Sequence, residues 1–381
     1  MSGRQMVSEE SKGQRQPRIN PTSGRLSIKP RRNKRREKDS GPLYWFGPFD
    51  RCDGYGDVAR SSTLAVSKIA NIRIQSKKIF HHHIRDSLKL GHLLHESEQA
   101  HGPQFSIQAI GSIRPPMGTK NAVFTMWEAS ILDPAWVRTV NQYDLVIVPC
   151  DEVADVFRKQ VSTPVVTVPQ GLDHSLYYPS KRPTRTTTRF GTAGNLRHGR
   201  ERKGVDRAIE WFLEAFPSNP NVSLSVKLND CDDAIRDDDP RIEIIRGNLT
   251  HTHIADWLRS LDCYVDASSY EGWGMWPFHA MATSLPVIGT YFGGHREYFS
   301  FRNHLPIGYR IEPAEGFYSK YGVWAMPIAS EGVAAMRWIV DHPQEAREIG
   351  RKAQNHVQTF TWERFAREIL EALEEYEIYQ T

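Results

Sequence analysis

The fold is decided by residues 268–297, SSYEGWGMWPFHAMATSLPVIGTYFGGHRE. A short apolar run, CYVDAS at residues 263–268, leads into this stretch and predicts a buried strand. A loop containing glycine follows it, then a helix over residues 275–284 and a second strand, PVIGT, at residues 286–290. A strand, a helix and a second strand in this order form a βαβ unit, in which both strands lie parallel in one sheet.

The same alternation of short apolar runs and amphipathic stretches extends from residue 42 onward and predicts mostly parallel sheets. In the first half, a helix is expected from the glycines at 54 and 56 to about residue 69, and strands at residues 42–49, near Ile72, and at 105–112, 121–127, 144–150 and 164–171. In the second half, strands are expected at residues 189–193, 222–228 and 241–247, and helices at 205–216 and 250–260. Three helical patterns close the chain, the last over residues 362–377.

A stretch rich in proline and threonine, PSKRPTRTTT at residues 179–188, separates the two series and predicts a linker. We therefore expect a tail at residues 1–40, an N-terminal domain at 41–178, a C-terminal domain at 179–360 and a closing helix at 361–381. Ligands of such α/β domains bind at the carboxyl ends of the strands, so the cleft between the two domains is where we expect the chemistry.

Charge is concentrated in the tail. Residues 1–40 contain twelve lysines and arginines against four acidic residues, whereas the whole chain has a formal net charge of +4. Because this segment has almost no large apolar residues, it cannot bury enough surface to fold alone, and we expect it to be disordered. A run such as KPRRNKRREK could bind a polyanion, and a tail that only increases solubility is the alternative.

Composition otherwise indicates an ordinary globular protein. A length of 381 residues suits two domains, and no apolar run approaches the ~18 residues needed to span a bilayer. The basic N-terminus lacks the apolar core of a secretion signal. Four widely spaced cysteines predict reduced thiols rather than disulfides or zinc ligands: Cys52, Cys150, Cys231 and Cys263. These features predict a cytoplasmic protein without a transmembrane segment.

The motif order in residues 268–297 resembles that of the retaining glycosyltransferases known as group 1 or family 4. These carry a Ser-x-x-Glu-Gly-x-Gly loop, a helix, then Pro-Val-Ile and Gly-Gly-x-x-Glu. FGTAGNLRHGRERKG at residues 190–204 and VPQGLDHSLYYP at residues 168–179 extend the resemblance, which covers roughly residues 42–375. It implies an α/β fold of the GT-B type: two facing Rossmann-like domains, an interdomain cleft, and a C-terminal helix that returns to the N-terminal domain.

The resemblance also implies a reaction. A sugar would be moved from a nucleoside-diphosphate sugar, UDP in preference to GDP, to an acceptor hydroxyl with retention of configuration. Fixed cations at the departing phosphate stabilise such a transition state without a metal ion, and no separate cofactor is expected. By resemblance Lys203 has this role, with Arg197 or Arg202 as its partner.

The loop that begins at Glu271 is expected to hold the sugar. A carboxylate accepts hydrogen bonds from sugar hydroxyls, and Gly272 and Gly274 would let backbone amides approach phosphate oxygens. Eight positions later the sequence departs from the family, because His279 replaces a second glutamate that accepts both ribose hydroxyls. We expect His279 to lie at the ribose. Since an imidazole cannot reproduce a bidentate carboxylate contact, the nucleotide preference stays open.

Two features of the first half are expected at the same site. Gly54 and Gly56 would form a turn that, by resemblance, approaches the diphosphate. Glu128 follows the strand expected at residues 121–127, and its carboxylate is suited to orienting the acceptor hydroxyl or taking its proton. A structural role for Glu128, as a cap of the following turn, is equally open.

The acceptor and the activity itself have alternatives. A saccharide or lipid-linked hydroxyl is the common acceptor in the family, and the basic tail adds hydroxymethylated DNA as a second possibility. His279 also permits a catalytically silent protein that binds a nucleotide-sugar.

Two further interpretations are rejected from the sequence. Gly54, Gly56 and Ala59 match a dinucleotide fingerprint, but the following strand does not end in an acidic residue near Gln75, which argues against a dehydrogenase. His92 and His95 would share a helix face, yet no carboxylate or cysteine partner is placed near them, so no metal site is predicted.

Overall fold

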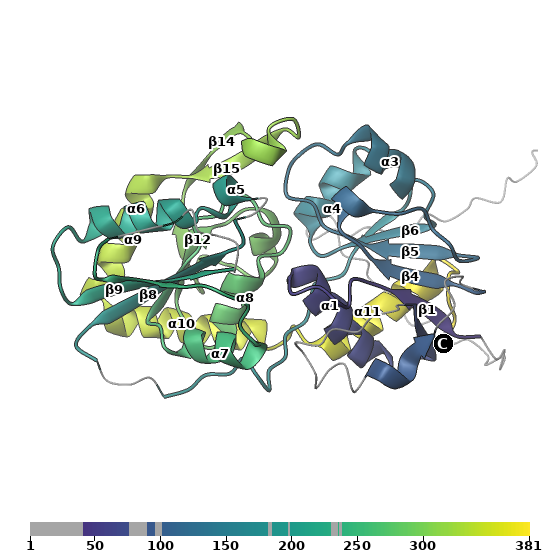
Figure 1. Ribbon diagram of the computed structural model, residues 1–381, viewed down its shortest axis with the longest axis horizontal. Helices are drawn as coiled ribbons and strands as arrows, with labels where there is room; N and C mark the ends of the chain where they lie inside the picture. Colours follow the sequence, from purple (N-terminus) through teal and green to yellow (C-terminus); the bar gives the residue numbers. More distant parts are fainter. Residues whose placement is uncertain are drawn as a thin grey trace, which may run out of the picture. The chain divides into compact units, whose positions relative to one another are not determined.

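The strands form two parallel sheets and one separate hairpin in the part of the chain that the structure describes (Figure 1). This computed structural model describes residues 41–75, 90–95, 101–181, 185–196, 199–229, 235 and 238–381. The basic tail, with its expected disorder and polyanion contact, lies outside the described residues, as does Cys231.

The first sheet has the strand order β3-β2-β1-β4-β5-β6-β7, and every pairing in it is parallel. Its strands are β1 (Leu43–Phe46), β2 (Ile72–Gln75), β3 (Leu94–His95), β4 (Gln104–Ile107), β5 (Asn121–Phe124), β6 (Leu145–Val148) and β7 (Val165–Thr167). In Figure 1, α1 (Gly54–Val66) and α11 (Trp362–Glu375) cover one face, and α3 (Pro134–Val140) and α4 (Asp151–Arg158) cover the other. With both faces covered, the central strands β4, β5 and β6 are buried along their whole length.

The second sheet has the order β10-β9-β8-β11-β12-β13 and is also parallel. Its strands are β8 (Thr188–Gly194), β9 (Val222–Leu228), β10 (Ile242–Ile245), β11 (Cys263–Val265), β12 (Val287–Thr290) and β13 (Leu305–Ile307). On one face lie α6 (Val205–Ala215) and α9 (Ala329–Asp341), and on the other lie α7 (His251–Arg259), α8 (Met275–Ala282) and α10 (Pro343–Val357) (Figure 1). Short helical turns complete the fold: α5 (Arg200–Lys203), η2 (Gly91–Leu93), η3 (Ile110–Ser112) and η4 (Gly293–Glu297).

These two sheets confirm the α/β architecture expected from the alternating pattern. The parallel pair β11–β12 with α8 between them is the βαβ unit of residues 263–290. Strands and helices of the second series begin and end within a few residues of their expected positions, and β9 matches fully.

The C-terminal helix α11 returns to the first sheet, as expected. Its first turn is capped by the Thr361 hydroxyl, which accepts a hydrogen bond from the backbone N–H of Arg364 at 3.0 Å. The buried Phe365 ring lies 5.5 Å from the ring of Phe124 on β5, centroid to centroid. The end of the chain therefore contributes to the core under the first sheet.

An antiparallel hairpin in the second half was not predicted from the sequence. It consists of β14 (Tyr309–Pro313), the turn η5 (Gly316–Tyr318) and β15 (Val323–Pro327). The Trp324 indole N–H donates to the Glu128 carbonyl at 2.9 Å, and the backbone N–H of Ile131 donates to the Tyr321 carbonyl at 2.9 Å. The hairpin is thus fastened to the loop at residues 126–133, which follows β5 of the first sheet.

The expected strand over residues 121–127 is too long, because β5 ends at Phe124. The reason is the hydroxyl of Tyr55 on α1. It donates to the Met126 carbonyl at 3.1 Å and accepts from the Met126 N–H at 3.0 Å, so this peptide pairs with a side chain instead of a neighbouring strand. The chain then turns away from the sheet, and Glu128 lies in a loop rather than directly at a strand end.

Two local expectations were wrong. Gly54 and Gly56 belong to the first turn of α1 and do not form a separate turn, because the Asp53 carboxylate accepts from the Gly56 N–H at 3.1 Å and starts the helix there. His92 and His95 do not share a helix face, since residues 91–93 form a single 3₁₀ turn and His95 ends β3.

Candidate active site

A cavity of about 370 Å³ is lined by loops that follow strands of both sheets. Small-molecule sites typically measure ~300 to 1,000 Å³ and lie at the carboxyl ends of parallel strands. The first half of the chain supplies residues from the loop before α1 and from the loop after β5. The second half supplies the loops after β8, β10 and β11, together with the start of α8.

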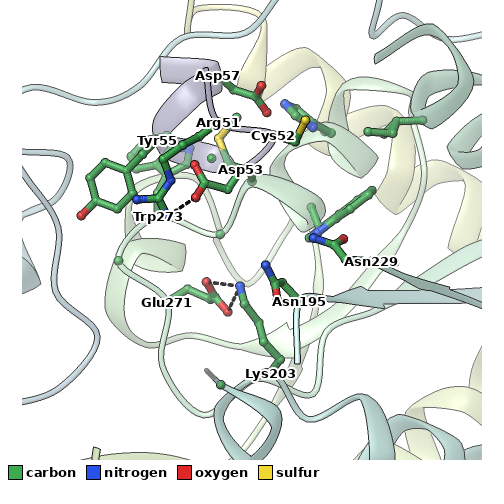
Figure 2. A pocket seen from close by; sticks show the side chains of 18 of the residues that line it. Arg51, Cys52, Asp53, Tyr55, Asp57, Asn195, Lys203, Asn229, Glu271 and Trp273 are labelled. Atoms are coloured by element: carbon green, nitrogen blue, oxygen red, sulfur yellow. Dashed lines mark hydrogen bonds and ion pairs between the residues drawn. The ribbon is translucent and has the colours of Figure 1, made fainter. Parts of the chain in front are cut away.

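A buried carboxylate, Glu271, held by Lys203 and Arg202, forms the floor of this cavity. Figure 2 shows Glu271 beside Lys203. The Lys203 ammonium donates to both oxygens of Glu271, at 2.8 Å and 2.9 Å, and an Arg202 guanidinium nitrogen lies 3.0 Å from Oε1. The Arg202 guanidinium also donates to the Tyr270 carbonyl at 2.7 Å, which fixes its direction.

The electrostatics of this site favour the ionised forms of Glu271 and Arg202. Burial raises the pKa of the Glu271 carboxyl, but Arg202 and Lys203 outweigh it and hold the pKa at about 2. For Arg202, burial lowers the guanidinium pKa, and the charge of Glu271 more than reverses this, so its pKa lies above the usual value. Two fixed positive charges therefore face the cavity at one carboxylate.

A glycine sets the position of Lys203. Lys203 ends α5, and Gly204 joins it to α6 with a left-handed φ of +63°. A Cβ at position 204 would lie 2.0 Å from the Ala267 carbonyl oxygen, so only glycine fits. The backbone N–H of Ser269 donates to the Arg202 carbonyl at 2.8 Å, and this ties the loop carrying Glu271 to the helix carrying both cations.

The glycines of the loop at Glu271 allow neighbouring side chains to pack closely against its backbone. Gly274 has φ +87°, and a Cβ there would lie 2.6 Å from both the Tyr298 hydroxyl and a ring nitrogen of His295. A Cβ on Gly272 would lie 3.0 Å from the Met126 Cβ of the first half. Both glycines line the cavity, and their expected approach to phosphate oxygens stays a prediction.

On the other wall, Glu128 is paired with the hairpin. The Tyr318 hydroxyl donates to Glu128 Oε2 at 3.2 Å. Burial raises the pKa of Tyr318 and the nearby Glu128 raises it further, so the phenol stays protonated and remains a donor. The Tyr318 ring also lies 5.6 Å from the guanidinium carbon of Arg202 and so connects the two walls.

A third group surrounds His279. Its ring stacks on Tyr177 with centroids 3.9 Å apart and planes 11° apart. The Tyr177 hydroxyl lies 2.8 Å from His251 Nδ1, and His251 Nε2 lies 3.0 Å from Asp57 Oδ1. Burial lowers the pKa of His279 to about 3, with His251 acting in the same direction, so its imidazole is neutral near pH 7.

The structure brings most of the expected site residues to this one cavity: Lys203, Arg202, Glu271, Glu128, Gly54, Gly272, Gly274 and His279. Gly56 does not line it, because a Cβ there would lie 2.1 Å from the Arg51 carbonyl and its surface faces the chain's own backbone. Arg197 lies outside the described residues, so Arg202 is the arginine that the structure shows beside Lys203.

Sequence reasoning missed several residues of the cavity. Asp57, His251 and Tyr318 line it but belong to no motif that was recognised. Asp57 could be recognised in the sequence as an acidic residue near the start of a helix, but its contact with His251, 194 positions away, could not. Nothing in the sequence around Tyr318 indicated a hairpin that reaches the first half.

The described residues contain no group of three or more histidine, cysteine or acidic side chains that could hold a metal ion. No helix among them has the length and apolar character needed to cross a membrane.

Comparison with known proteins finds a family similarity in the second half of the chain. Residues 187–315 match the family described as glycosyl transferases group 1. The lipopolysaccharide core biosynthesis mannosyltransferase LpsB of Rhizobium meliloti is 28% identical over 116 residues, which are 28% of this chain and 32% of LpsB. The D-inositol 3-phosphate glycosyltransferase of an Arthrobacter species is 26% identical over 221 residues, 54% of this chain and 48% of that enzyme. The matched regions thus span less than half of either relative.

Solved structures agree on the fold. The sucrose-phosphate synthase of Thermosynechococcus elongatus superposes with a TM-score of 0.62 at 14% identity, covering 88% of this chain and 98% of that one. HepE of Anabaena, solved with UDP and glucose, gives 0.61 at 14% identity, covering 88% and 99%. Residues 187–315 of this chain are therefore similar to group 1 glycosyltransferases, and the molecule has the two-sheet GT-B architecture.

Proposed function

We propose that this chain is a retaining glycosyltransferase, which moves a sugar from a nucleoside-diphosphate sugar to an acceptor hydroxyl without a metal ion. The observation that carries the proposal is the pair of fixed cations, Lys203 and Arg202, around Glu271 in a cavity lined by both sheets. Loss of the sugar leaves negative charge on the departing diphosphate, and preorganised cations stabilise that charge in the transition state. Glu271 accepts hydrogen bonds from hydroxyls of the transferred sugar.

The donor is a UDP-sugar in preference to a GDP-sugar. HepE and the pneumococcal O-GlcNAc transferase GtfA, which share the fold, were both solved with UDP. The nucleotide occupies the region of His279, and the diphosphate faces Lys203 and Arg202.

The acceptor is a hydroxyl of a saccharide or a lipid-linked saccharide. The similarity to LpsB, a mannosyltransferase of lipopolysaccharide core biosynthesis, supports this class of acceptor. Glu128 is the residue that orients this hydroxyl, because its carboxylate lines the cavity and is held by Tyr318.

A panel of donors tests the activity. Free UDP or GDP released from each of several UDP- and GDP-sugars is measured with purified full-length protein, with and without candidate saccharides and hydroxymethylated DNA. We expect release from at least one UDP-sugar. Nucleotide-dependent thermal stabilisation without release from any donor would indicate a silent binder and contradict the proposal. Release that requires the DNA would overturn the saccharide acceptor.

Replacement of the central cation gives the matched test. Lys203→Met keeps the length of the side chain but removes its charge, and we expect kcat to fall ~100- to 1,000-fold, the usual effect of losing one group that stabilises transition-state charge. Lys352→Met is the control, because Lys352 is exposed on α10 and contacts only Glu348 among the described ion pairs. A Lys203→Met enzyme within twofold of wild type would rule out the assigned role.

A further inference from the structure

The outer strand of the hairpin, β14, presents an open edge. It pairs with β15 alone, and no other strand of the part of the chain that the structure describes joins this two-stranded sheet. Figure 1 shows β14 at the rim of the second half. All its residues are exposed except Glu312, which is partly buried. Because an unpaired strand edge offers a row of free N–H and C=O groups, it is a template onto which a further strand can pair.

The contacts of β15 show which way the peptide groups of β14 face. The backbone N–H of Ala325 donates to the Ser269 carbonyl at 3.1 Å, on the side of β15 that is turned away from β14. In an antiparallel ladder, two residues directly opposite each other either exchange hydrogen bonds or both face away. Ile311 lies opposite Ala325, so its N–H and C=O face the open edge. Tyr309 and Pro313 share this direction, although a proline has no N–H to donate.

The side chains of β14 alternate between two kinds of chemistry. Tyr309 and Ile311 lie on one face of the hairpin and are 38% and 55% exposed. Arg310 and Glu312 lie on the opposite face, and neither takes part in an ion pair or a side-chain hydrogen bond with another described residue. The edge therefore offers one basic and one acidic group to a partner, two positions apart.

We propose that β14 pairs with β14 of a second copy of this chain, antiparallel about a twofold axis at Ile311. Ile311 and the second copy's Ile311 then exchange N–H to C=O hydrogen bonds in the middle of the contact. Arg310 lies opposite Glu312 of the second copy, and by symmetry Glu312 lies opposite its Arg310. The same patch is used on both copies, as a twofold interface requires.

Charge selects this register among those that a twofold axis allows. Opposite charges directly across two strands stabilise the pair, and like charges destabilise it. An axis at Arg310 would place two guanidinium groups opposite each other, and an axis at Glu312 would do the same with two carboxylates. With the axis at Tyr309 or Pro313, both charged residues would lie opposite uncharged ones. Only the axis at Ile311 matches each charge with its opposite.

We expect this association to be weak, because β14 has only five residues. Such a short edge buries less than the ~1,200 Å² of typical stable complexes, which corresponds to dissociation constants of about 1 to 100 µM. The contact does not involve Lys203 or Glu271, so it stands independently of the proposed function.

Sedimentation velocity of the full chain from ~1 to 200 µM measures the pairing. We expect wild type to shift from monomer to dimer over this range. Arg310→Glu makes the edge acidic and Glu312→Arg makes it basic, so each variant alone should stay monomeric. An equimolar mixture of the two variants should form a dimer, because every charge then faces its opposite.

Two further variants separate pairing from structural damage. Ile311→Pro removes an N–H that faces the open edge and not β15, so it should abolish the dimer while the melting temperature stays close to that of wild type. Lys352→Glu, an exposed charge reversal on α10, is the control and should dimerise like wild type. A monomeric wild type at every concentration, a dimer that survives both charge reversals, or a mixture that stays monomeric overturns the proposal. None of these outcomes bears on sugar transfer.

Discussion

At the scale of the residue, the ion trio of Arg202, Lys203 and Glu271 is the feature on which the proposed chemistry depends. Buried ion pairs often contribute little net stability, because desolvation offsets the attraction between the charges. Here the carboxylate instead holds two cations in a fixed direction before a ligand enters the cavity. A diphosphate that enters then meets charges whose positions need no rearrangement, which is the condition for effective electrostatic catalysis.

His279 should make the protein sensitive to mild acid. Burial lowers the pKa of His279 from the ordinary 6.5 to about 3. Between these two pH values the unfolded chain therefore binds a proton at this histidine that the folded protein does not bind. Stability contributed by this histidine is therefore lost as the pH falls through that window, at up to about 1.4 kcal/mol per pH unit.

Urea unfolding at pH 6 and pH 5 measures this effect. We expect His279→Gln to lose about 1 kcal/mol less than wild type between these two pH values. His253→Gln, an exposed histidine on α7, serves as the control and should keep the wild-type loss. A slope in His279→Gln equal to that of wild type would contradict the assignment of a buried neutral imidazole.

The sequence predicted the chemistry of single residues unevenly. Lys203 and Glu271 were assigned to one site by the family resemblance. Sheet geometry agrees with this assignment, because each residue follows a strand of one parallel sheet and the ends of such strands meet at one edge. Asp57 and His251 come from different sheets, and their contact depends on how the two halves pack. No periodicity or local motif carries that information.

At the scale of the element, the joint between α5 and α6 controls the direction of Lys203. Gly204→Ala would place a Cβ 2.0 Å from the Ala267 carbonyl at a positive φ, and we expect a loss of at least about 2 kcal/mol in the free energy of unfolding. Nucleotide release should fall as well, because Lys203 must move with the helix end.

Gly111→Ala is the matched control for this joint. A Cβ at position 111 meets its nearest neighbour, a ring carbon of Trp136, at 3.7 Å, which is an ordinary contact, and no positive φ is involved. Its unfolding free energy should stay within about 0.5 kcal/mol of wild type. A free energy of unfolding for Gly204→Ala equal to that for Gly111→Ala would contradict the steric constraint described at Gly204.

Element prediction succeeded where one face of a segment is consistently buried. The strand at residues 222–228, VSLSVKL, was located fully because apolar residues occupy every second position and are buried in the core. The hairpin was missed because β14 is only five residues long and exposed at almost every position, so it presents no buried apolar face. Its strands are specified by their contacts with Glu128 and Ser130, far away in the chain.

At the scale of the whole molecule, α11 makes the first sheet depend on the last residues of the chain. Phe365 is fully buried against Phe124, and truncation of a buried phenylalanine typically costs ~3 to 5 kcal/mol. We expect Phe365→Ala to lower the melting temperature by roughly 5 to 15 °C.

Phe317→Ala is the comparison, since Phe317 on η5 is 53% exposed and its truncation leaves no internal cavity. Differential scanning calorimetry of both variants measures the difference. A melting temperature for Phe365→Ala equal to that of Phe317→Ala would show that α11 does not stabilise the first sheet.

The architecture of the whole molecule was the most predictable property. Two parallel sheets followed from one alternating pattern, and the return of the last helix followed from the family resemblance. The shared cavity could be expected only in outline, because its walls are completed by the hairpin and α1, which reach it from separate parts of the sequence.

The setting of Trp127 gives the molecule an intrinsic optical reporter. Its indole, in the loop after β5, lies 5.1 Å from the Tyr318 ring and 5.0 Å from the Tyr321 ring, centroid to centroid, and both tyrosines belong to the hairpin segment of the second half. Indole emission shifts to the red when water replaces such neighbours. A movement that parted the hairpin from this loop would therefore change the part of the fluorescence spectrum that Trp127 contributes.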